Sequence, residues 1–307
     1  MTRVSHEPMP GIRNVLFATD FTQTSYPALQ FAASVTRNLE TKLIVFHVIQ
    51  PDAVGFASPE VLRNYFVDLD TNATKQMSEI SAMLADTQHE CVIRHGYIAE
   101  ELSSVVREEE VGLIVVGTGL VNGATRLLLG SMAEGIAREV PCPVLIVGAN
   151  TAAPKSELFR SVLVASDLGG YEASAAALAR TLSGKDASIS VLYVIDQRQH
   201  IPDRVRVLKQ IRRQMEALLP SGDAAANARV VIEFGRPAEQ IVEQARRDHA
   251  DLIVMGLQNT EHPHWATHFT TVLHDVLTQV SCPVLAIPRK VARVSRQPEE
   301  EMGVVAQ

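Results

Sequence analysis

The chain repeats itself, and this repetition constrains its fold more than any other feature. The segment NVLFATDF at Asn14–Phe21 recurs as SVLVASDL at Ser161–Leu168, an offset of 147 residues. Three further pairs of blocks follow in the same order. FHVI matches YVID at an offset of 146, aligned on Val48 and Val194, and VVG matches VMG at an offset of 139, ending at Gly117 and Gly256. PCPVLI matches SCPVLA at an offset of 140, around Cys142 and Cys282. Four ordered matches indicate a duplicated domain whose loops have changed length.

Each half predicts an alternation of short buried strands and amphipathic helices. The expected strands of the first half are Val15–Ala18, Leu43–Val48, Cys91–Ile93, Leu113–Val116 and Val144–Val147. These runs are apolar and rich in β-branched residues, as is typical of strands covered on both faces. Apolar residues at helical spacing lie between the strands: Ala28, Leu29, Ala32, Val35 and Leu39; Met132, Ile136 and Val140; Ala175, Leu178, Ala179 and Leu182; Val272, Val276 and Val280. The fold class is therefore α/β, with two tandem open parallel five-stranded sheets and helices on both faces, in a Rossmann-like arrangement.

The length of 307 residues fits two domains of ordinary size. We expect the first domain at 1–149, a linker at 150–159 and the second domain at 160–289. The segment 290–307 is polar, with a proline and a run of three glutamates, and we expect it to be disordered. We also expect the last strands of the two halves, Val144–Val147 and Val284–Ile287, to approach each other, because this contact would hide exposed sheet edges.

Composition excludes several classes of protein. The formal charge is −7, the sequence pI is about 5.8, and no long run of Lys or Arg occurs, which argues against nucleic acid as a partner. No apolar stretch is long enough for a membrane span, and Met1–Arg13 has no apolar core of a secretory signal. Three cysteines suit a reducing compartment, so we expect a cytoplasmic protein.

Ligands of open parallel sheets bind beyond the carboxyl ends of the strands, where the strand order reverses. Asp20 follows the first expected strand there, and its carboxylate could accept hydrogen bonds from a ribose or a base amine. The alternative is that Asp20 only caps the next helix or shapes the turn. Gly117, Gly119 and the pair Gly130-Ser131 follow the fourth strand, where bare backbone and a hydroxyl at a helix start could approach phosphate.

ATDF, HVI, the glycine-containing loop that ends in LLLGS, and CPVLIV together resemble the universal stress protein family. The resemblance extends from about Asn14 to Pro288 and implies the adenine nucleotide alpha hydrolase-like fold with ATP as a cofactor. The residues that it implies for nucleotide binding are Thr19, Asp20, Val48, Val116, Gly117, Gly119, Gly130, Ser131 and Met132. ATP-binding members have Gly, two residues, Gly, nine residues and Gly-Ser. Here Leu120 holds the middle glycine position, and Gly119 lies one place early.

The second half departs further from this pattern. Asp167, Val194 and Gly256 remain, but the loop after Gly256 has no glycine, and Thr270-Thr271 replace Gly130-Ser131. We therefore expect the second half to pair with the first rather than to hold triphosphate. The same loop carries three histidines, His262, His264 and His268, which could bind zinc or another divalent ion. Their spacing matches no metal motif, and we favour a solvated loop without a metal.

Cys142 and Cys282 occupy equivalent positions before the last strand of each half, where they could lie near a pseudo-twofold axis or simply be buried apolar thiols. The sequence has no Ser-His-Asp elbow, CxxC pair or Walker motif. The leading interpretation is a regulatory stress-response protein that binds an adenine nucleotide and pairs its own domains, in a chain that could also form a homodimer. The alternatives are a slow ATPase and an interaction protein without nucleotide, and we favour a non-enzymatic role.

Overall fold

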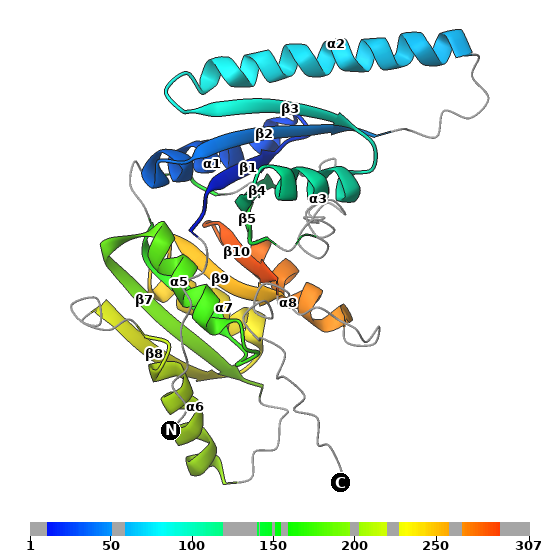
Figure 1. Ribbon diagram of the computed structural model, residues 1–307. Coiled ribbons are helices and arrows are strands. Elements are labelled where there is room, and N and C mark those ends of the chain that lie inside the picture. The colour runs from blue at the N-terminus through cyan, green and yellow to red at the C-terminus, as the bar shows by residue number, and fades with distance from the viewer. Residues whose placement is uncertain are drawn as a thin grey trace, which may run out of the picture.

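A computed structural model describes residues 11–50, 59–118, 140, 142–148, 151–154, 159–196, 203–219, 227–257 and 266–288. The strands of the first half are β1 (Asn14–Ala18), β2 (Lys42–Ile49), β3 (His89–His95), β4 (Val111–Gly117) and β5 (Val144–Val147). They form a parallel array in the order β3-β2-β1-β4-β5. The chain runs outward from β1 to β3 and then crosses back to β4, so the strand order reverses between β1 and β4 (Figure 1).

The second half repeats this arrangement. Its strands are β6 (Phe159–Ser166), β7 (Ser183–Ile195), β8 (Ala228–Phe234), β9 (Leu252–Leu257) and β10 (Val284–Pro288). They are parallel in the order β8-β7-β6-β9-β10, which places the second reversal between β6 and β9. The expectation of a parallel five-stranded sheet in each half is confirmed.

The two sheets are joined into one. β5 pairs with β10 in antiparallel register, with Leu145 opposite Leu285 and Val144 opposite Ala286. The result is a continuous ten-stranded sheet, in which only this central pair is antiparallel. The expected approach of the last strands is thus a direct hydrogen-bonded pairing. Because the strands of the two halves run in opposite directions, their carboxyl ends lie along opposite edges of the sheet (Figure 1).

Helices cover both faces of the sheet. One face packs against α1 (Tyr26–Leu39), α2 (Pro59–Met83), α5 (Glu172–Leu182) and α6 (Arg204–Glu216). The other packs against α3 (Ile98–Glu108), α7 (Pro237–Arg247) and α8 (Ala266–Leu277). Each face carries an apolar core that includes residues of both halves, and the rings of Phe31 and Phe159 stack across the junction with centroids 6.2 Å apart. The helix expected at Ser131–Val140 lies outside the described residues, apart from Val140, which is buried.

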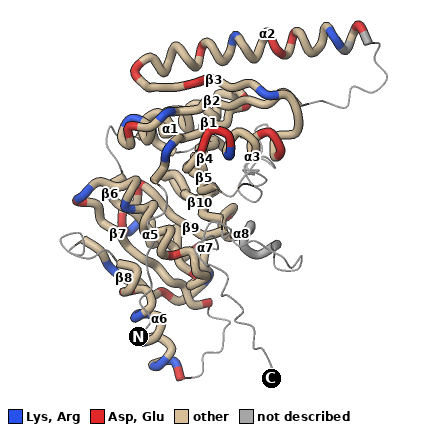
Figure 2. The backbone as a smooth tube through the Cα atoms, in the orientation of Figure 1, with Lys and Arg blue, Asp and Glu red and all other residues tan. Residues whose placement is uncertain are grey.

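The expected apolar stripes explain this packing. Ala28, Leu29, Ala32 and Val35 of α1 are buried, and Leu39 packs partly against the core. In α5 the four expected residues are buried: Ala175, Leu178, Ala179 and Leu182. α2, the longest helix, carries charged residues along its length (Figure 2), and no helix within the described part of the chain is long and apolar enough to span a bilayer.

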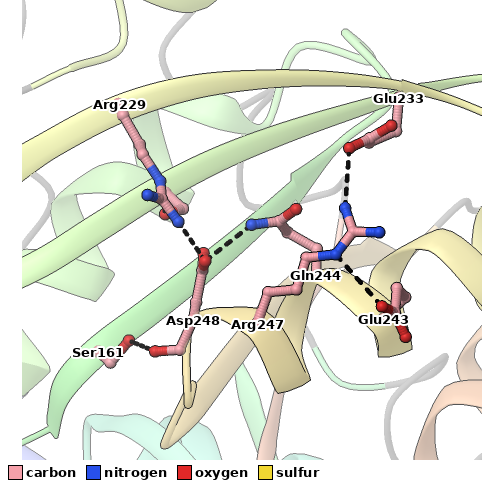
Figure 3. Close-up of polar contacts among 8 residues, drawn as sticks. Ser161, Arg229, Glu233, Glu243, Gln244, Arg247 and Asp248 are labelled. Atoms are coloured by element: carbon pink, nitrogen blue, oxygen red, sulfur yellow. Dashed lines mark hydrogen bonds and ion pairs between the residues drawn. The ribbon is translucent and has the colours of Figure 1, made fainter.

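The halves also repeat polar contacts at the amino ends of their strands. The Asn14 side chain donates to the carbonyl of Glu109 (2.6 Å), and the equivalent Ser161 hydroxyl donates to the carbonyl of Asp248 (2.8 Å; Figure 3). Each hydrogen bond connects the first strand of a half to the carboxyl end of the helix that follows the third strand, which is α3 in the first half and α7 in the second. The duplication therefore preserves specific hydrogen bonds as well as the order of the strands.

Candidate functional site

A compact turn follows β1 at the first reversal of strand order. Thr19 continues the strand, since its backbone N–H donates to the carbonyl of Phe46 (3.0 Å). Its buried hydroxyl oxygen accepts a hydrogen bond from the N–H of Phe21 (2.9 Å). Phe21 has φ of 62°, which is unusual for a bulky residue and turns the chain sharply toward α1. Thr19 thus shapes the turn that presents Asp20.

Asp20 is exposed at the tip of this turn. One carboxylate oxygen, Oδ1, accepts hydrogen bonds from the N–H (3.0 Å) and the hydroxyl (2.6 Å) of Thr22. This is the turn-shaping role that the sequence left open as an alternative. The second oxygen, Oδ2, has no hydrogen bond to any residue in the described part of the chain, and it can accept one from a ligand.

His47 of β2 contacts the same turn through Thr19 and Phe21. It was not among the residues expected at the site. Its Nδ1 lies 2.8 Å from the carbonyl oxygen of Thr19, and its ring lies 4.1 Å from that of Phe21. Because a carbonyl only accepts, Nδ1 carries the proton in this contact. Burial lowers the pKa of His47, while the Thr19 carbonyl and Asp20 oppose the shift. The repeated FHVI block was the available sequence signal, but only its valine was interpreted as functional.

Two valines and a glycine lie at the neighbouring strand ends. Val48 near the end of β2 and Val116 in β4 are both buried, and Gly117 is the last residue of β4. A Cβ atom at Gly117 would lie 3.0 Å from both the Cα of Ser25 and the carbonyl oxygen of Thr24. A side chain at this position would therefore crowd the backbone that leads into α1, whether or not a ligand is bound.

The structure brings five of the expected residues together at this reversal of strand order: Thr19, Asp20, Val48, Val116 and Gly117. Gly119, Gly130, Ser131 and Met132 lie outside the described residues, as does Leu120. The described part of the expected site is thus the part formed by the strand ends and the turn after β1.

The second half builds the same turn after β6. The hydroxyl of Ser166 accepts from the N–H of Leu168 (3.0 Å), and Asp167 Oδ1 accepts from the N–H of Gly169 (2.9 Å). Leu168 has φ of 57°, close to that of Phe21. One difference is Glu172, which is buried and accepts from the Ser166 hydroxyl (3.0 Å) and the Gly170 N–H (2.8 Å) where the first half has Ser25.

The histidines expected in the loop after β9 are only partly described. His262 and His264 lie outside the described residues, and His268 lies within α8, because this helix already begins at Ala266. Assigning His268 to the loop was therefore wrong. No group of three potential metal-ligating side chains occurs among the residues that the structure describes.

Cys142 and Cys282 are both buried free thiols. Burial raises the pKa of each to about 12, so neither is ionised near neutral pH. The interpretation as buried apolar thiols is the one that the structure supports.

Comparison with known proteins identifies the family. The model of the "Universal stress protein family" matches residues 11–148 and again 158–288. A putative universal stress protein of Staphylococcus haemolyticus is 28% identical over 143 residues, which cover 44% of this chain and 84% of that protein. Universal stress protein YxiE of Bacillus subtilis is 27% identical over 143 residues, covering 43% and 97%.

Both halves also match together in a solved structure. A universal stress protein from Archaeoglobus fulgidus aligns with 90% of this chain and 98% of its own, with a TM-score of 0.67 and 19% identity, which shows a common fold. The sequence blocks, the repeated strand order and the double match agree: the chain belongs to the universal stress protein family and carries two copies of its domain.

Proposed function

We propose that this protein is a regulatory stress-response protein that binds ATP at the strand-order reversal between β1 and β4. One observation carries the proposal: Asp20 stands exposed at that point, held by Thr22 through one oxygen, while the other makes no hydrogen bond within the described part of the chain. Ligands of open α/β sheets bind at such points. A fixed carboxylate oxygen there is suited to accept a hydrogen bond from a ribose hydroxyl or an adenine amine.

The remaining parts of the site follow from this placement. Val48 and Val116 supply apolar surface beside the nucleoside, and Gly117 keeps the end of β4 free of a side chain. The residues that follow, Gly119, Gly130, Ser131 and Met132, would contact the phosphates, as their resemblance to the ATP-binding pattern suggests. We propose a binding role rather than catalysis, in which ATP acts as a signal.

Calorimetric titration with ATP tests the proposal. We expect Asp20→Ala to weaken binding about tenfold or more, because a hydrogen bond to a charged group contributes about 1.5–3 kcal/mol. Asp20→Asn is the matched control, since an amide oxygen can still accept from Thr22 while the charge is lost. Asp167→Ala, the equivalent change in the second half, should leave ATP affinity unchanged.

Each outcome decides a separate point. Equal losses in Asp20→Ala and Asp167→Ala would mean that both halves bind. Parent-like binding by Asp20→Ala would show that the carboxylate does not contact the ligand. A parent protein that does not bind ATP at all would contradict the proposal and favour an interaction protein.

A further inference from the structure

The two points of strand-order reversal differ in one large side chain. Tyr171, at the start of α5, is only 2% exposed, although it precedes the first residue of the helix. Its equivalent in the first half is Thr24, which is partly buried and whose hydroxyl lies 2.9 Å from that of Thr22. The duplicated turn therefore places a buried phenol ring in one half and a smaller, partly buried polar side chain in the other.

The Tyr171 ring lies between the carboxyl ends of two strands. Its hydroxyl donates to the carbonyl of Ala165 in β6 (2.7 Å). A Cβ atom built on Gly256 of β9 would fall 2.2 Å from Cε1 and 2.3 Å from Cζ of the ring, so the ring lies directly against the glycine backbone. Burial raises the pKa of Tyr171, and the hydroxyl stays protonated as a donor.

β6 and β9 are the adjacent strands at which the order of the second half reverses. In an open α/β sheet a ligand occupies this crevice. Among the described residues of the first half, a Cβ atom on Gly117 would meet the backbone of Thr24 and Ser25 and the Cβ atom of Ala28, with no aromatic ring in contact. Gly256 matches a glycine of the family pattern, but in this half its lack of a side chain allows the Tyr171 ring to pack against its backbone.

We propose that Tyr171 is an internal occupant of the second crevice, which closes that half to nucleotides and limits the chain to one site. The single site rests on the proposed function of the first half; the closure of the second half does not. Tyr171 is in this sense a residue that determines which of two duplicated sites can bind. Its ring supplies the apolar contacts, and its hydroxyl occupies a strand-end carbonyl that a ligand could otherwise reach.

Replacing the ring should open a space that a free phenol can fill. The probe is phenol, and the variants are Tyr171→Thr, which installs the residue of the first half, and Tyr171→Ala, with Tyr171→Phe as the control that keeps the ring. We expect phenol to raise the Tm of the Thr and Ala variants saturably, by about 1.5–2 °C at roughly five times its Kd. The parent protein and Tyr171→Phe should show no saturable shift.

Calorimetry with ATP on the parent protein supplies a second measurement that needs no variant. A stoichiometry of one per chain supports the closure, and a stoichiometry of two overturns it. A stoichiometry of zero contradicts the proposed function alone, and the phenol experiment then decides the closure. Folded Thr and Ala variants that phenol does not stabilise would also overturn it, because the ring would then fill no ligand-sized space.

Discussion

His47 is a partly buried residue that links two elements of the site. It connects β2 to the turn after β1, through the Thr19 carbonyl and the Phe21 ring. In the second half Tyr193 takes the same place in the strand, and burial together with the nearby Asp167 raises its pKa. Each half thus keeps a side chain in its neutral form next to the aspartate that follows its first strand.

The lowered pKa of His47 predicts a pH dependence of stability. Between the folded pKa and the ordinary value near 6.5, the unfolded chain binds a proton that the folded chain does not. The stabilisation is therefore complete above about pH 6.5 and is lost as the pH falls through the folded pKa. We expect the free energy of unfolding in urea to fall less steeply below that pH in His47→Gln than in the parent, by at most about 1.4 kcal/mol per pH unit. Equal slopes would contradict the assignment.

At the scale of elements, the duplication has reversed the charges of one contact while keeping its geometry. In the first half Arg94 of β3 pairs with Glu108 of α3 (2.7 Å). In the second half Glu233 of β8 pairs with Arg247 of α7 (3.1 Å; Figure 3). The residues are equivalent, at an offset of 139 in both strand and helix. The same edge strand and helix are held together by either order of charges.

This reversal predicts the result of a charge swap. We expect Arg94→Glu and Glu108→Arg each to lower the free energy of unfolding by about 0.2–1 kcal/mol, since the pair is exposed and like charges then face each other. The double variant should recover most of the loss, because it reproduces the arrangement of Glu233 and Arg247. Urea unfolding of the four proteins gives the coupling energy, and a double variant as unstable as the sum of the singles would refute the equivalence.

Glu109 and Asp248, the residues that directly follow α3 and α7, differ in how deeply their side chains are buried. The Asp248 side chain is 5% exposed and accepts from Arg229 and from the buried amide of Gln244 (2.7 Å), whereas the equivalent Glu109 is 31% exposed and pairs with Lys42 (3.0 Å). Asp248→Ala leaves the Gln244 amide without its acceptor, so we expect a loss of about 1–3 kcal/mol. Glu109→Ala, the matched control, should cost about 1 kcal/mol or less. Similar losses by urea unfolding would show that burial does not separate the two sites.

The sequence predicted the strands and helices more reliably than the side-chain contacts between them. The repeated blocks and apolar runs predicted the strands, because a buried parallel strand can be recognised from its own short run of apolar, β-branched residues. The start of β7 was less apparent, since Ser183–Ala187 contains glycine and charged residues, and within it only Ser183 pairs with β6 before the register shifts. Asp20 was found from its position after a strand, whereas the burial of Tyr171 depends on Gly256, 85 residues away in the chain.

At the scale of the whole molecule, the central pairing of β5 with β10 makes one folding unit of two domains. The sheet is continuous and the cores on both faces contain residues of both halves. Neither half buries its last strand without the other. The two domains should therefore not unfold independently.

The buried cysteines can test this, because each half contains one next to its last strand. In a Cys91→Ser background, which removes the exposed thiol, Cys142→Ser and Cys282→Ser leave a single reporter in either half. We expect both reporters to react with a thiol reagent at the same urea midpoint, since one cooperative transition exposes them together. Two separate midpoints would show that the halves open in turn.

The antiparallel junction also has a consequence for the history of the chain. It turns the two crevices toward opposite poles of the protein, so that a substitution in one does not intrude on the other. Meanwhile the shared sheet obliges both copies to keep their folds. Duplication under these conditions leaves one copy free to lose an inherited task while its scaffold remains under selection. Under the proposed closure, Tyr171 at one pole and the exposed Asp20 at the other make one closed and one open crevice on a single scaffold.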